Sequence, residues 1–297
     1  VQHEYGIFGS KSIYSWVFFP VLYLLCFLTR KEVVTTLHSA WTPAMISPPL
    51  RLVKRVYVWL NNTMLVHTNN HLIFLSDNAR DKFTASVKVP DESYTVYPHG
   101  VPTDTSELST AEAKEHLGYD TDETLVIEPG YIRPEKNQDY FVKLAGSFPD
   151  KTFVVAGGVA QGESGEYLAR LREQATSNVD ITGALDGKSF KAVFKAADLV
   201  VLPYEYAYQS GIVNWCVAHE CPVVGNDIRY FQDLRDKHNA VAVADLGTDE
   251  GVTVIRDLLN DESAREELVT NMSKYRETRT MPAVADQHIS LYNRLIQ

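Results

Sequence analysis

Residues 124–149 read TLVIEPGYIRPEKNQDYFVKLAGSFP, and residues 198–227 read DLVVLPYEYAYQSGIVNWCVAHECPVVGND. In both stretches a short apolar run leads into a turn, and the turn leads into helix-forming sequence. The turns carry an Arg, a Lys and a Ser-Gly pair. Ligands of open parallel sheets bind at the carboxyl ends of the strands. A cationic side chain beside a helix N-terminus suits a phosphate, so these stretches predict a nucleotide-diphosphate site.

The composition describes an acidic chain that is long enough for two domains. It has 297 residues, 45% of them hydrophobic, with a net charge of −10 and a pI near 5.4. Domains of ~100–200 residues are typical, so two are expected. Nucleic-acid phosphates need a basic footprint, which argues against a nucleic-acid partner. The three cysteines show neither metal spacing nor a disulfide framework, which favours a reducing compartment; they are Cys26, Cys216 and Cys221.

The first thirty residues lead to two expectations. The chain begins with Val1 and the strand-like VQHEYG, without the pattern of a signal peptide, so we expect the first domain to be truncated at its N-terminal side. Residues 13–28 (IYSWVFFPVLYLLCFL) are apolar, but they contain Pro20 and fall short of the ~20 residues that span a membrane. The prediction is a buried helix, with a membrane-surface helix as the alternative.

Strand-like and helix-like segments alternate along nearly the whole chain. A polar, turn-rich segment at 102–112 (PTDTSELSTAE) separates two such series. The first series has a predicted helix at 51–60 and strand-like runs at 32–38 (EVVTTLH), 64–68 (MLVHT), 71–76 (HLIFLS) and 93–102 (SYTVYPHGVP). The second has the strand-like runs TLVIE, KTFVVAG, VDIT, DLVVLP, PVVG and AVAVA.

This alternation predicts an α/β protein with two doubly wound, Rossmann-like domains. Near-continuous apolar strands are typical of parallel sheets that are covered on both faces. Residues 1–105 form the first domain, which we expect to be incomplete because four strands are few for such a sheet. Residues 106–280 form the second. Residues 281–297 are expected to be a C-terminal helix that packs back on the first domain.

Five segments, taken in order, resemble a known family. They are HEYGIFG (3–9), VVTTLHS (33–39), YPHGVP (97–102), GYIRPEKN (130–137) and the segment 203–227. Together they resemble the nucleotide-sugar glycosyltransferases of the GT-B fold, and most of all the retaining family 4 type, the glycosyl transferases group 1. The resemblance extends over essentially the whole chain.

The resemblance implies two domains that face a cleft, with the donor nucleotide on the second domain and the acceptor on the first. The donor would be a nucleoside-diphosphate sugar, and the reaction would proceed with retention. No metal or other cofactor is expected, because basic side chains and a helix N-terminus offset the charge of the leaving diphosphate.

The turn after the strand at 124–128 supplies the expected diphosphate contacts. Lys136 matches the family's diphosphate lysine, and a helix dipole beside it also favours an anion. The family places an Arg directly after the turn glycine, Gly130, but Tyr131 stands there in this chain. Arg133 lies two residues further on and is the expected second contact. The structural alternative for both cations is a solvated surface position.

The segment 203–227 departs from the family at two carboxylates. The family has a Glu for the sugar and a second Glu for the ribose, where this chain has Ala207 and Trp215. Glu205 is the expected substitute for the first. The glycine that usually precedes the distal proline by two residues is Glu220 here. These departures motivate a non-catalytic alternative.

Backbone groups complete the predicted donor site. Ser210 and Gly211 open a helix, and a small residue followed by glycine lets N–H groups approach a phosphate. The loop 181–190 corresponds to the family's base-binding loop, with Gly183, Ala184 and Leu185 as the candidate contacts.

Three residues of the first domain are predicted to face the reaction. His38 ends a strand, and in the family the histidine at this place hydrogen-bonds the donor sugar; a structural histidine is the alternative. His3 and Glu4 precede the glycines of HEYGIFG, where acceptor contact and loop structure are equally credible. His99 is interpreted as a structural residue.

The leading hypothesis is a hexosyltransferase that acts in glycan, glycolipid or polysaccharide synthesis. The alternative is a non-catalytic GT-B protein that binds a nucleotide sugar or partners an active transferase. An epimerase is a third hypothesis, but it would need acid and base carboxylates that the sequence does not supply.

The expected partners are the donor and an unknown glycan or lipid-linked acceptor, in the cytoplasm. The predicted helix 51–60 carries Arg51, Lys54 and Arg55 beside Tyr57 and Trp59. This pattern suits peripheral contact with the cytoplasmic membrane face, although a solvated helix face explains it as well.

Overall fold

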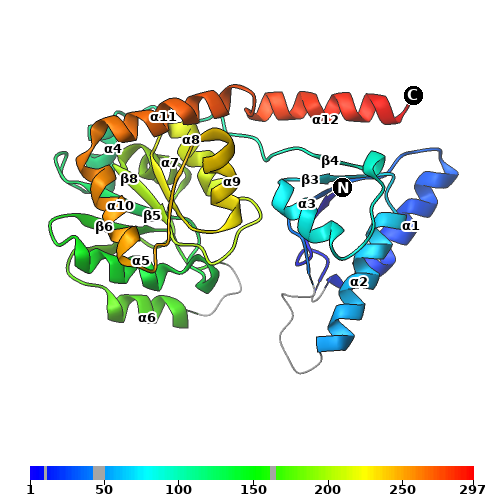
Figure 1. Ribbon diagram of the computed structural model, residues 1–297, viewed down its shortest axis with the longest axis horizontal. Helices are drawn as coiled ribbons and strands as arrows, with labels where there is room; N and C mark the ends of the chain where they lie inside the picture. The colour runs from blue at the N-terminus through cyan, green and yellow to red at the C-terminus, as the bar shows by residue number, and fades with distance from the viewer. Residues whose placement is uncertain (10–11, 43–50, 161–164) are drawn as a thin grey trace. The chain divides into compact units, whose positions relative to one another are not determined.

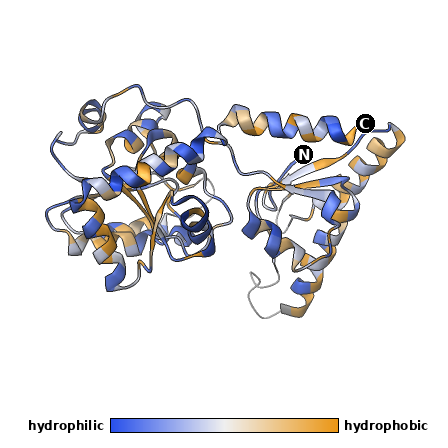
Figure 2. Ribbon diagram, turned by 45° about the horizontal axis from the view of Figure 1, so that its top comes forward, coloured by the Kyte–Doolittle hydropathy of each residue, from blue (hydrophilic) through white to orange (hydrophobic). Residues whose placement is uncertain are grey.

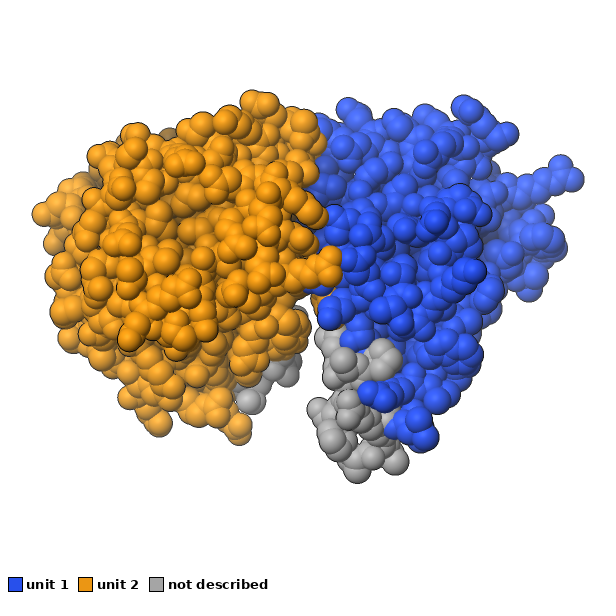
Figure 3. All heavy atoms as spheres, viewed as in Figure 1, with its two compact units in different colours: residues 1–100, 282–297 blue, residues 101–281 orange. Residues whose placement is uncertain are grey.

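The computed structural model describes residues 1–9, 12–42, 51–160 and 165–297. Of Arg51 it describes the backbone only. These residues form two compact units (Figure 3). Unit 1 consists of residues 1–100 and 282–297, and unit 2 of residues 101–281.

Unit 1 contains a four-stranded parallel sheet with the order β1-β2-β3-β4. The strands are β1 (Gln2–His3), β2 (Val34–Leu37), β3 (His71–Phe74) and β4 (Tyr94–Val96). The helices are α1 (Ser15–Leu28), α2 (Arg51–His67), α3 (Asp77–Thr84), the 3-10 helix η3 (Asp91–Ser93) and α12 (Met281–Leu295).

The predicted strand at 64–68 is wrong, because most of this segment is the last turn of α2. Side-chain hydrogen bonds reinforce that helix end. The hydroxyl of Thr68 donates to the carbonyl of Met64 (2.8 Å), and the amide of Asn69 donates to the carbonyl of Leu65 (2.7 Å). The apolar periodicity of the helix therefore overrides the β-branched residues, and β3 begins only at His71.

The prediction that residues 13–28 form a buried helix is also wrong. They do form a helix, α1, but only Ser15 and Phe19 within it are buried. Phe27 and Leu28 are each 68% exposed. Figure 2 shows α1 mostly in hydrophobic colours. No helix among the described residues is long and apolar enough to cross a membrane.

Unit 2 contains a six-stranded parallel sheet in the order β10-β9-β8-β5-β6-β7. Figure 1 labels three of its strands, β5, β6 and β8. The six strands predicted for the second series are confirmed. They are β5 (Leu125–Pro129), β6 (Thr152–Ala156), β7 (Val179–Ile181), β8 (Leu199–Leu202), β9 (Val223–Asn226) and β10 (Ala242–Ala244). The strand order reverses between β5 and β8, which is where doubly wound sheets bind ligands.

Helices cover both faces of this sheet. One core cluster packs α5 (Gln138–Leu144), α6 (Glu166–Gln174), α10 (Asp249–Asn260) and α11 (Glu262–Glu277) on one face. Two clusters on the other face include α4 (Thr110–Leu117), α7 (Gly187–Ala196), α8 (Gly211–His219) and α9 (Arg229–His238). Two 3-10 helices, η4 (Pro134–Lys136) and η5 (Ala145–Ser147), flank α5.

The two segments at which the chain passes between the units are hydrogen-bonded to each other. Val101 and Thr280 form an isolated parallel bridge. The N–H of Val101 donates to the carbonyl of Arg279 (2.6 Å), and the N–H of Met281 donates to the carbonyl of Val101 (3.0 Å). The chain therefore leaves unit 2 beside the place where it enters.

Candidate functional site

Three turns at the carboxyl edge of the unit 2 sheet contact one another. A Cβ atom on Gly157, after β6, would lie 2.0 Å from the carbonyl oxygen of Gly130, after β5. A Cβ atom on Gly158 would lie 2.9 Å from the backbone nitrogen of Ala184, after β7. The N–H of Ile132 donates to the carbonyl of Gly158 (3.0 Å), which ties the first two turns together. Glycine is required at 157 because the backbones approach so closely.

Lys136 ends η4, and its ammonium group turns back toward the end of β5. Its Nζ atom donates to the carbonyl of Pro129 (3.4 Å) and to the hydroxyl of Tyr204 (3.2 Å). The same atom lies 5.1 Å from the centre of the Tyr204 ring. Both hydrogen-bond partners are neutral oxygens, and no carboxylate of a described residue forms an ion pair with Nζ. Burial lowers the pKa of Lys136. The group is therefore a partly desolvated cation without a bound counter-charge.

Glu128 is a carboxyl group enclosed in the same region. Its side chain is fully buried on β5, and neither oxygen has a hydrogen-bond partner among the described residues. Burial raises its pKa well above the ordinary value, against the opposing effect of Lys136, and Asp139 raises it further. A raised pKa favours the neutral form of Glu128, which leaves the charge of Lys136 available for an anion.

The N-terminus of α8 lies at the end of the next strand. Ser210 is its N-cap, and its hydroxyl accepts a hydrogen bond from the N–H of Val213 (3.3 Å). Burial raises the pKa of Tyr204 and of Tyr230, and the nearby Ser210 acts in the opposite direction on both. A Cβ atom on Gly211 would meet nothing within 4 Å, so this side of the helix end is open. Such a helix end attracts an anion.

The two remaining predicted side chains of the donor site lie on the surface. Arg133 is exposed, and its guanidinium carbon lies 5.9 Å from the centre of the Tyr131 ring. Glu205 is exposed as well, and its N–H donates to the carbonyl of Glu135 (3.3 Å). Among the described residues, neither side chain forms a hydrogen bond or an ion pair with Lys136, although the charge of Arg133 contributes to lowering the Lys136 pKa. The structure does not bring them into the hydrogen-bond network of Lys136 and Tyr204.

The predicted base loop runs from the end of β7 to the start of α7. Gly183 has a positive φ of 75°, and Ala184 contacts Gly158 as described above. Leu185 packs against the core beneath α4 and α7. Asp186 caps α7 by accepting a hydrogen bond from the N–H of Ser189 (2.7 Å). The loop therefore presents backbone groups next to the glycine turns.

The two positions that lack the family's carboxylates belong to the apolar core of unit 2. Trp215 packs among the rings of Phe190, Phe194 and His219, with centroid distances of 5.5, 6.1 and 5.8 Å. Ala207 packs against the same cluster. Trp215 therefore makes aromatic contacts at the position where the resemblance implies a carboxylate.

The three predicted residues of unit 1 lie at the carboxyl ends of β1 and β2. The Nε2 atom of His38 lies 2.7 Å from Oε1 of Gln2. Burial lowers the pKa of His38, and the nearby Glu4, which is exposed, raises it. His38 and Glu4 are accessible to a ligand.

His3 differs from the other two because its ring is fully buried. Its ring lies against those of Tyr5, Phe8 and Phe19, at centroid distances of 4.7, 5.0 and 5.4 Å. Burial lowers its pKa to about 4, helped by His38. The buried ring has the surroundings of a structural residue, and acceptor contact through His3 stays a prediction.

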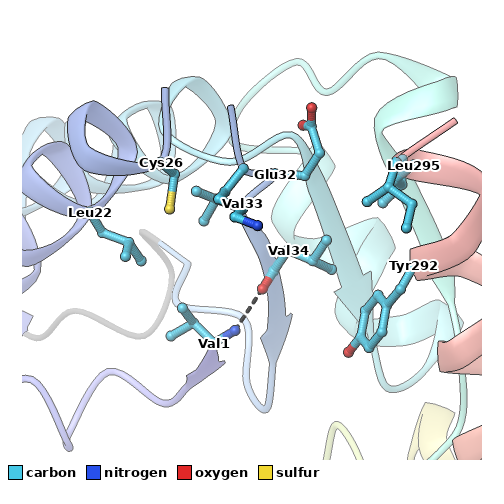
Figure 4. Close-up of a pocket in the computed structure, with 10 residues that line it drawn as sticks. Val1, Leu22, Cys26, Glu32, Val33, Val34, Tyr292 and Leu295 are labelled. Atoms are coloured by element: carbon cyan, nitrogen blue, oxygen red, sulfur yellow. Dashed lines mark hydrogen bonds between the residues drawn. The ribbon is translucent and has the colours of Figure 1, made fainter. Parts of the chain in front are cut away.

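Unit 1 also contains a cavity of about 360 Å³, at the opposite edge of its sheet from His38 (Figure 4). It lies where β2 begins, between α1 and α12. The lining is mostly apolar, with Lys31 and Glu32 at its charged part; its other residues are Val1, Leu22, Cys26, Val33, Val34, Tyr292, Leu295 and Ile296. None of the predicted site residues lines it.

Two residues of the unit 2 site escaped the sequence analysis. Tyr204 directly follows the proline of the turn after β8, and an aromatic side chain there is typical of a core residue. Glu128 carried the clearer signal, because a carboxylate inside the apolar run LVIEP has to be buried.

The comparison of this chain with known proteins also distinguishes unit 2, where the family match lies. Residues 124–261 match the family described as Glycosyl transferases group 1. The Alpha-D-kanosaminyltransferase of Streptomyces kanamyceticus is 26% identical over 238 residues, which are 75% of this chain and 60% of that protein. The Processive diacylglycerol alpha-glucosyltransferase of Acholeplasma laidlawii is 24% identical over 40% of this chain and 36% of that protein.

Solved structures show the same fold over nearly the whole chain. A sucrose-phosphate synthase from Thermosynechococcus elongatus superposes with a TM-score of 0.79 at 17% identity, covering 94% of this chain and 72% of that one. HepE from Anabaena, in complex with UDP and glucose, superposes with a TM-score of 0.76 at 17% identity, covering 92% and 74%.

Residues 124–261, within unit 2, thus carry a Glycosyl transferases group 1 domain, and the chain shares the GT-B fold of the solved structures. The resemblance inferred from the sequence is confirmed at this level. The chain spans about 60% or less of the curated relatives described above.

Proposed function

We propose that this chain transfers a hexosyl group from a nucleoside-diphosphate sugar to an acceptor hydroxyl, with retention, in the synthesis of a glycan, glycolipid or polysaccharide. One observation carries the proposal. The ammonium group of Lys136, after β5, hydrogen-bonds the hydroxyl of Tyr204, which lies between β8 and the N-terminus of α8, at the point where the strand order reverses.

The residues of unit 2 would act on the leaving diphosphate. As the bond from the sugar to the diphosphate breaks, negative charge grows on the phosphate oxygens. That charge would be offset by Lys136, by the N–H groups at Ser210 and Gly211, and by the long side chain of Arg133. The mechanism we propose therefore assigns no role to a metal. Glu205 remains the candidate for a contact with the sugar.

The other roles are proposed from the resemblance. Backbone groups of Gly183, Ala184 and Leu185 would hold the base, and Gly130 would let the phosphates approach the end of β5. His38 would hydrogen-bond the donor sugar, with Glu4 on the acceptor side. A UDP-sugar is the first donor to test, because HepE was solved with UDP-glucose.

We also propose that the chain acts in the cytoplasm and contacts the membrane peripherally through α1 and α2. α1 has no charged residue, and its exposed side chains include Val17, Val21, Leu24, Phe27 and Leu28. α2 exposes Leu52, Val53, Val56, Trp59 and Leu60, with Lys54 and Arg55 among them. Apolar and aromatic side chains beside basic groups suit an anionic lipid surface. A relative that is named for diacylglycerol supports a lipid-linked acceptor.

Vesicle flotation tests this membrane contact. The chain should float with vesicles that contain anionic phospholipid, and Phe27→Glu should reduce the bound fraction several-fold. Ile289→Glu on α12 is the matched control, because Ile289 is an exposed apolar residue of the same unit, 54% exposed. Equal flotation of both variants would contradict the proposed surface.

A thermal-shift titration with UDP, GDP, ADP and their common sugar conjugates tests the donor site. A ligand that binds only the folded state raises the melting temperature by mass action. One nucleotide family should stabilise the chain, and Lys136→Ala should abolish the shift. Lys143→Ala is the control, because Lys143 is an exposed lysine on the neighbouring α5.

Release of nucleoside diphosphate from the stabilising sugar conjugate then separates the two leading functions. Turnover that is lost in Lys136→Ala supports the transferase. Tight binding without transfer to any acceptor and without hydrolysis would favour the non-catalytic alternative. A folded Lys136→Ala variant that binds as tightly as the unchanged chain would refute the site.

A further inference from the structure

Tyr204 lies between the two elements that form the proposed diphosphate site. Its hydroxyl accepts a hydrogen bond from the Nζ atom of Lys136 (3.2 Å). The side chain of Ser210, the N-cap of α8, is close enough to the same hydroxyl to oppose the rise of its pKa by burial. Lys136 follows β5 and Ser210 follows β8, so this hydroxyl lies between turns that are more than seventy residues apart in the sequence.

The Tyr204 side chain is held in place from several sides. It is only 5% exposed, and its ring centroid lies 5.9 Å from that of Phe231. Its carbonyl accepts a hydrogen bond from the side-chain amide of Asn226 (3.1 Å). A buried tyrosine with two flexible χ angles fixed in this way presents its hydroxyl at one position.

Lys136 depends on such a fixed partner. A lysine side chain has four rotatable bonds and ordinarily extends into solvent, so its confinement costs conformational entropy. Here the ammonium group is confined beneath the glycine turn, where a Cβ atom on Gly130 would lie 2.5 Å from Nζ. The Tyr204 hydroxyl restrains the group without neutralising it, because the partner is uncharged.

We propose that Tyr204 is a positioning residue, whose hydroxyl holds the Lys136 ammonium beside the N-terminus of α8 so that both groups meet the same diphosphate. This inference rests on the proposed function. Its consequence is that the cation and the helix end form one preorganised anion site before the donor arrives. Preorganised charges cost no reorganisation at the moment of reaction.

Calorimetric titration of the full chain with inorganic pyrophosphate tests the proposal without knowledge of the base. Tyr204→Phe removes only the hydroxyl and should weaken pyrophosphate binding about 5- to 20-fold. Lys136→Ala should weaken it at least as much. In the double variant, Tyr204→Phe should add less than about a 2-fold loss to Lys136→Ala, because the hydroxyl acts through the lysine.

Tyr275→Phe is the matched control, because Tyr275 is a buried tyrosine, 8% exposed, in the same core cluster. It should leave pyrophosphate binding unchanged. Uridine, guanosine or adenosine, whichever corresponds to the stabilising nucleotide, should bind Tyr204→Phe as it binds the unchanged chain. A general structural defect would weaken the nucleoside as well, which would overturn the positioning role.

Lys136→Arg provides a second test that leaves Tyr204 intact. Arginine keeps the charge but replaces the ammonium by a larger, planar group that does not fit the same position under Gly130. The proposal expects about a 10-fold loss of pyrophosphate affinity, whereas unchanged affinity would show that charge alone matters.

The two proposals fail in different ways. If the unchanged chain binds neither pyrophosphate nor any nucleoside diphosphate, the donor site itself is refuted and the positioning role falls with it. If the unchanged chain binds and Tyr204→Phe binds equally well, only the positioning role is overturned.

Discussion

The carbonyl oxygen of Gly130 occupies the space in which Gly157 would carry a side chain. A Cβ atom built on Gly157 would lie 2.0 Å from that oxygen and 2.7 Å from the carbonyl carbon. Both atoms are backbone, so neither can move aside as a flexible side chain would. The turns after β5 and β6 can therefore approach only while residue 157 is glycine.

Gly157→Ala should lower the free energy of unfolding by about 2–3 kcal/mol, because the added methyl group overpacks a backbone contact. Chemical denaturation measures this change. Gly187→Ala is the control, because a Cβ atom there meets nothing within 4 Å. It should change the free energy of unfolding by less than about 0.5 kcal/mol. Equal effects of the two substitutions would show that the turns are not in contact.

Glu128→Gln should change how stability depends on pH. The folded-state pKa of Glu128 is raised by burial, so the folded chain binds a proton that the unfolded chain releases above about pH 4.3. The stabilisation by this proton is fully present below that pH and is lost as the pH rises through the folded-state pKa. Glu128→Gln cannot lose this stabilisation. The free energy of unfolding of the variant should therefore increase with pH relative to that of the unchanged chain. A constant difference would mean that Glu128 is ionised in both states.

His3→Phe should change the pH dependence of the free energy of unfolding in the opposite direction. The folded-state pKa of His3 is depressed to about 4 by burial, from an ordinary value of 6.5. A depressed histidine pKa means that stability is lost as the pH falls from 6.5 towards 4, because the unfolded chain takes up the proton first. Phenylalanine has no such proton and suits the aromatic neighbours.

The measurement for His3→Phe is urea denaturation at several pH values. The variant should equal or exceed the stability of the unchanged chain at pH 7, since two ring nitrogens without hydrogen-bond partners are removed. Its advantage should grow between pH 6.5 and 4. An advantage that stays the same across this range would contradict the buried, neutral imidazole.

Glu220→Gly should raise the free energy of unfolding by about 0.5–1 kcal/mol. Glu220 has a φ of 56° at the C-terminus of α8, a left-handed conformation that favours glycine. Glu220→Ala separates the two contributions of this residue. It removes the contact between the carboxylate and the Ser273 hydroxyl (3.2 Å) but keeps the strained Cβ, so it should not stabilise the chain. Thermal unfolding distinguishes the two.

The strands of unit 2 were predictable because each is a nearly continuous apolar run that ends in a turn. A strand buried on both faces needs no polar alternation, and that pattern survives in the sequence. Unit 1 was harder to predict. The run MLVHT contains the β-branched residues Val66 and Thr68 but follows residues 51–63 of the amphipathic helix α2, and helix packing took precedence. The exposure of α1 could not be derived, because an apolar helix ordinarily lies inside.

The site was predictable only where a residue type stands out against its turn. Lys136 and Ser210 are polar residues at strand ends, and the hydroxyl of Tyr204 lies between them. In the sequence, Tyr204 cannot be distinguished from an aromatic core residue, because only the structure gives the position of its hydroxyl. Trp215 shows that a functional role could not be predicted from position alone. The resemblance implies a carboxylate there, but the side chain packs with the aromatic rings of the core.

The helix α12 belongs to unit 1 but is synthesised after unit 2. It packs on the earlier part of unit 1, where the ring of His288 lies 5.2 Å from that of Tyr97. All of unit 2 is synthesised between these two residues, and domains tend to fold as they emerge. During translation unit 2 is therefore finished while the nascent unit 1 still lacks α12. Throughout this interval the earlier part of unit 1 is available to a chaperone.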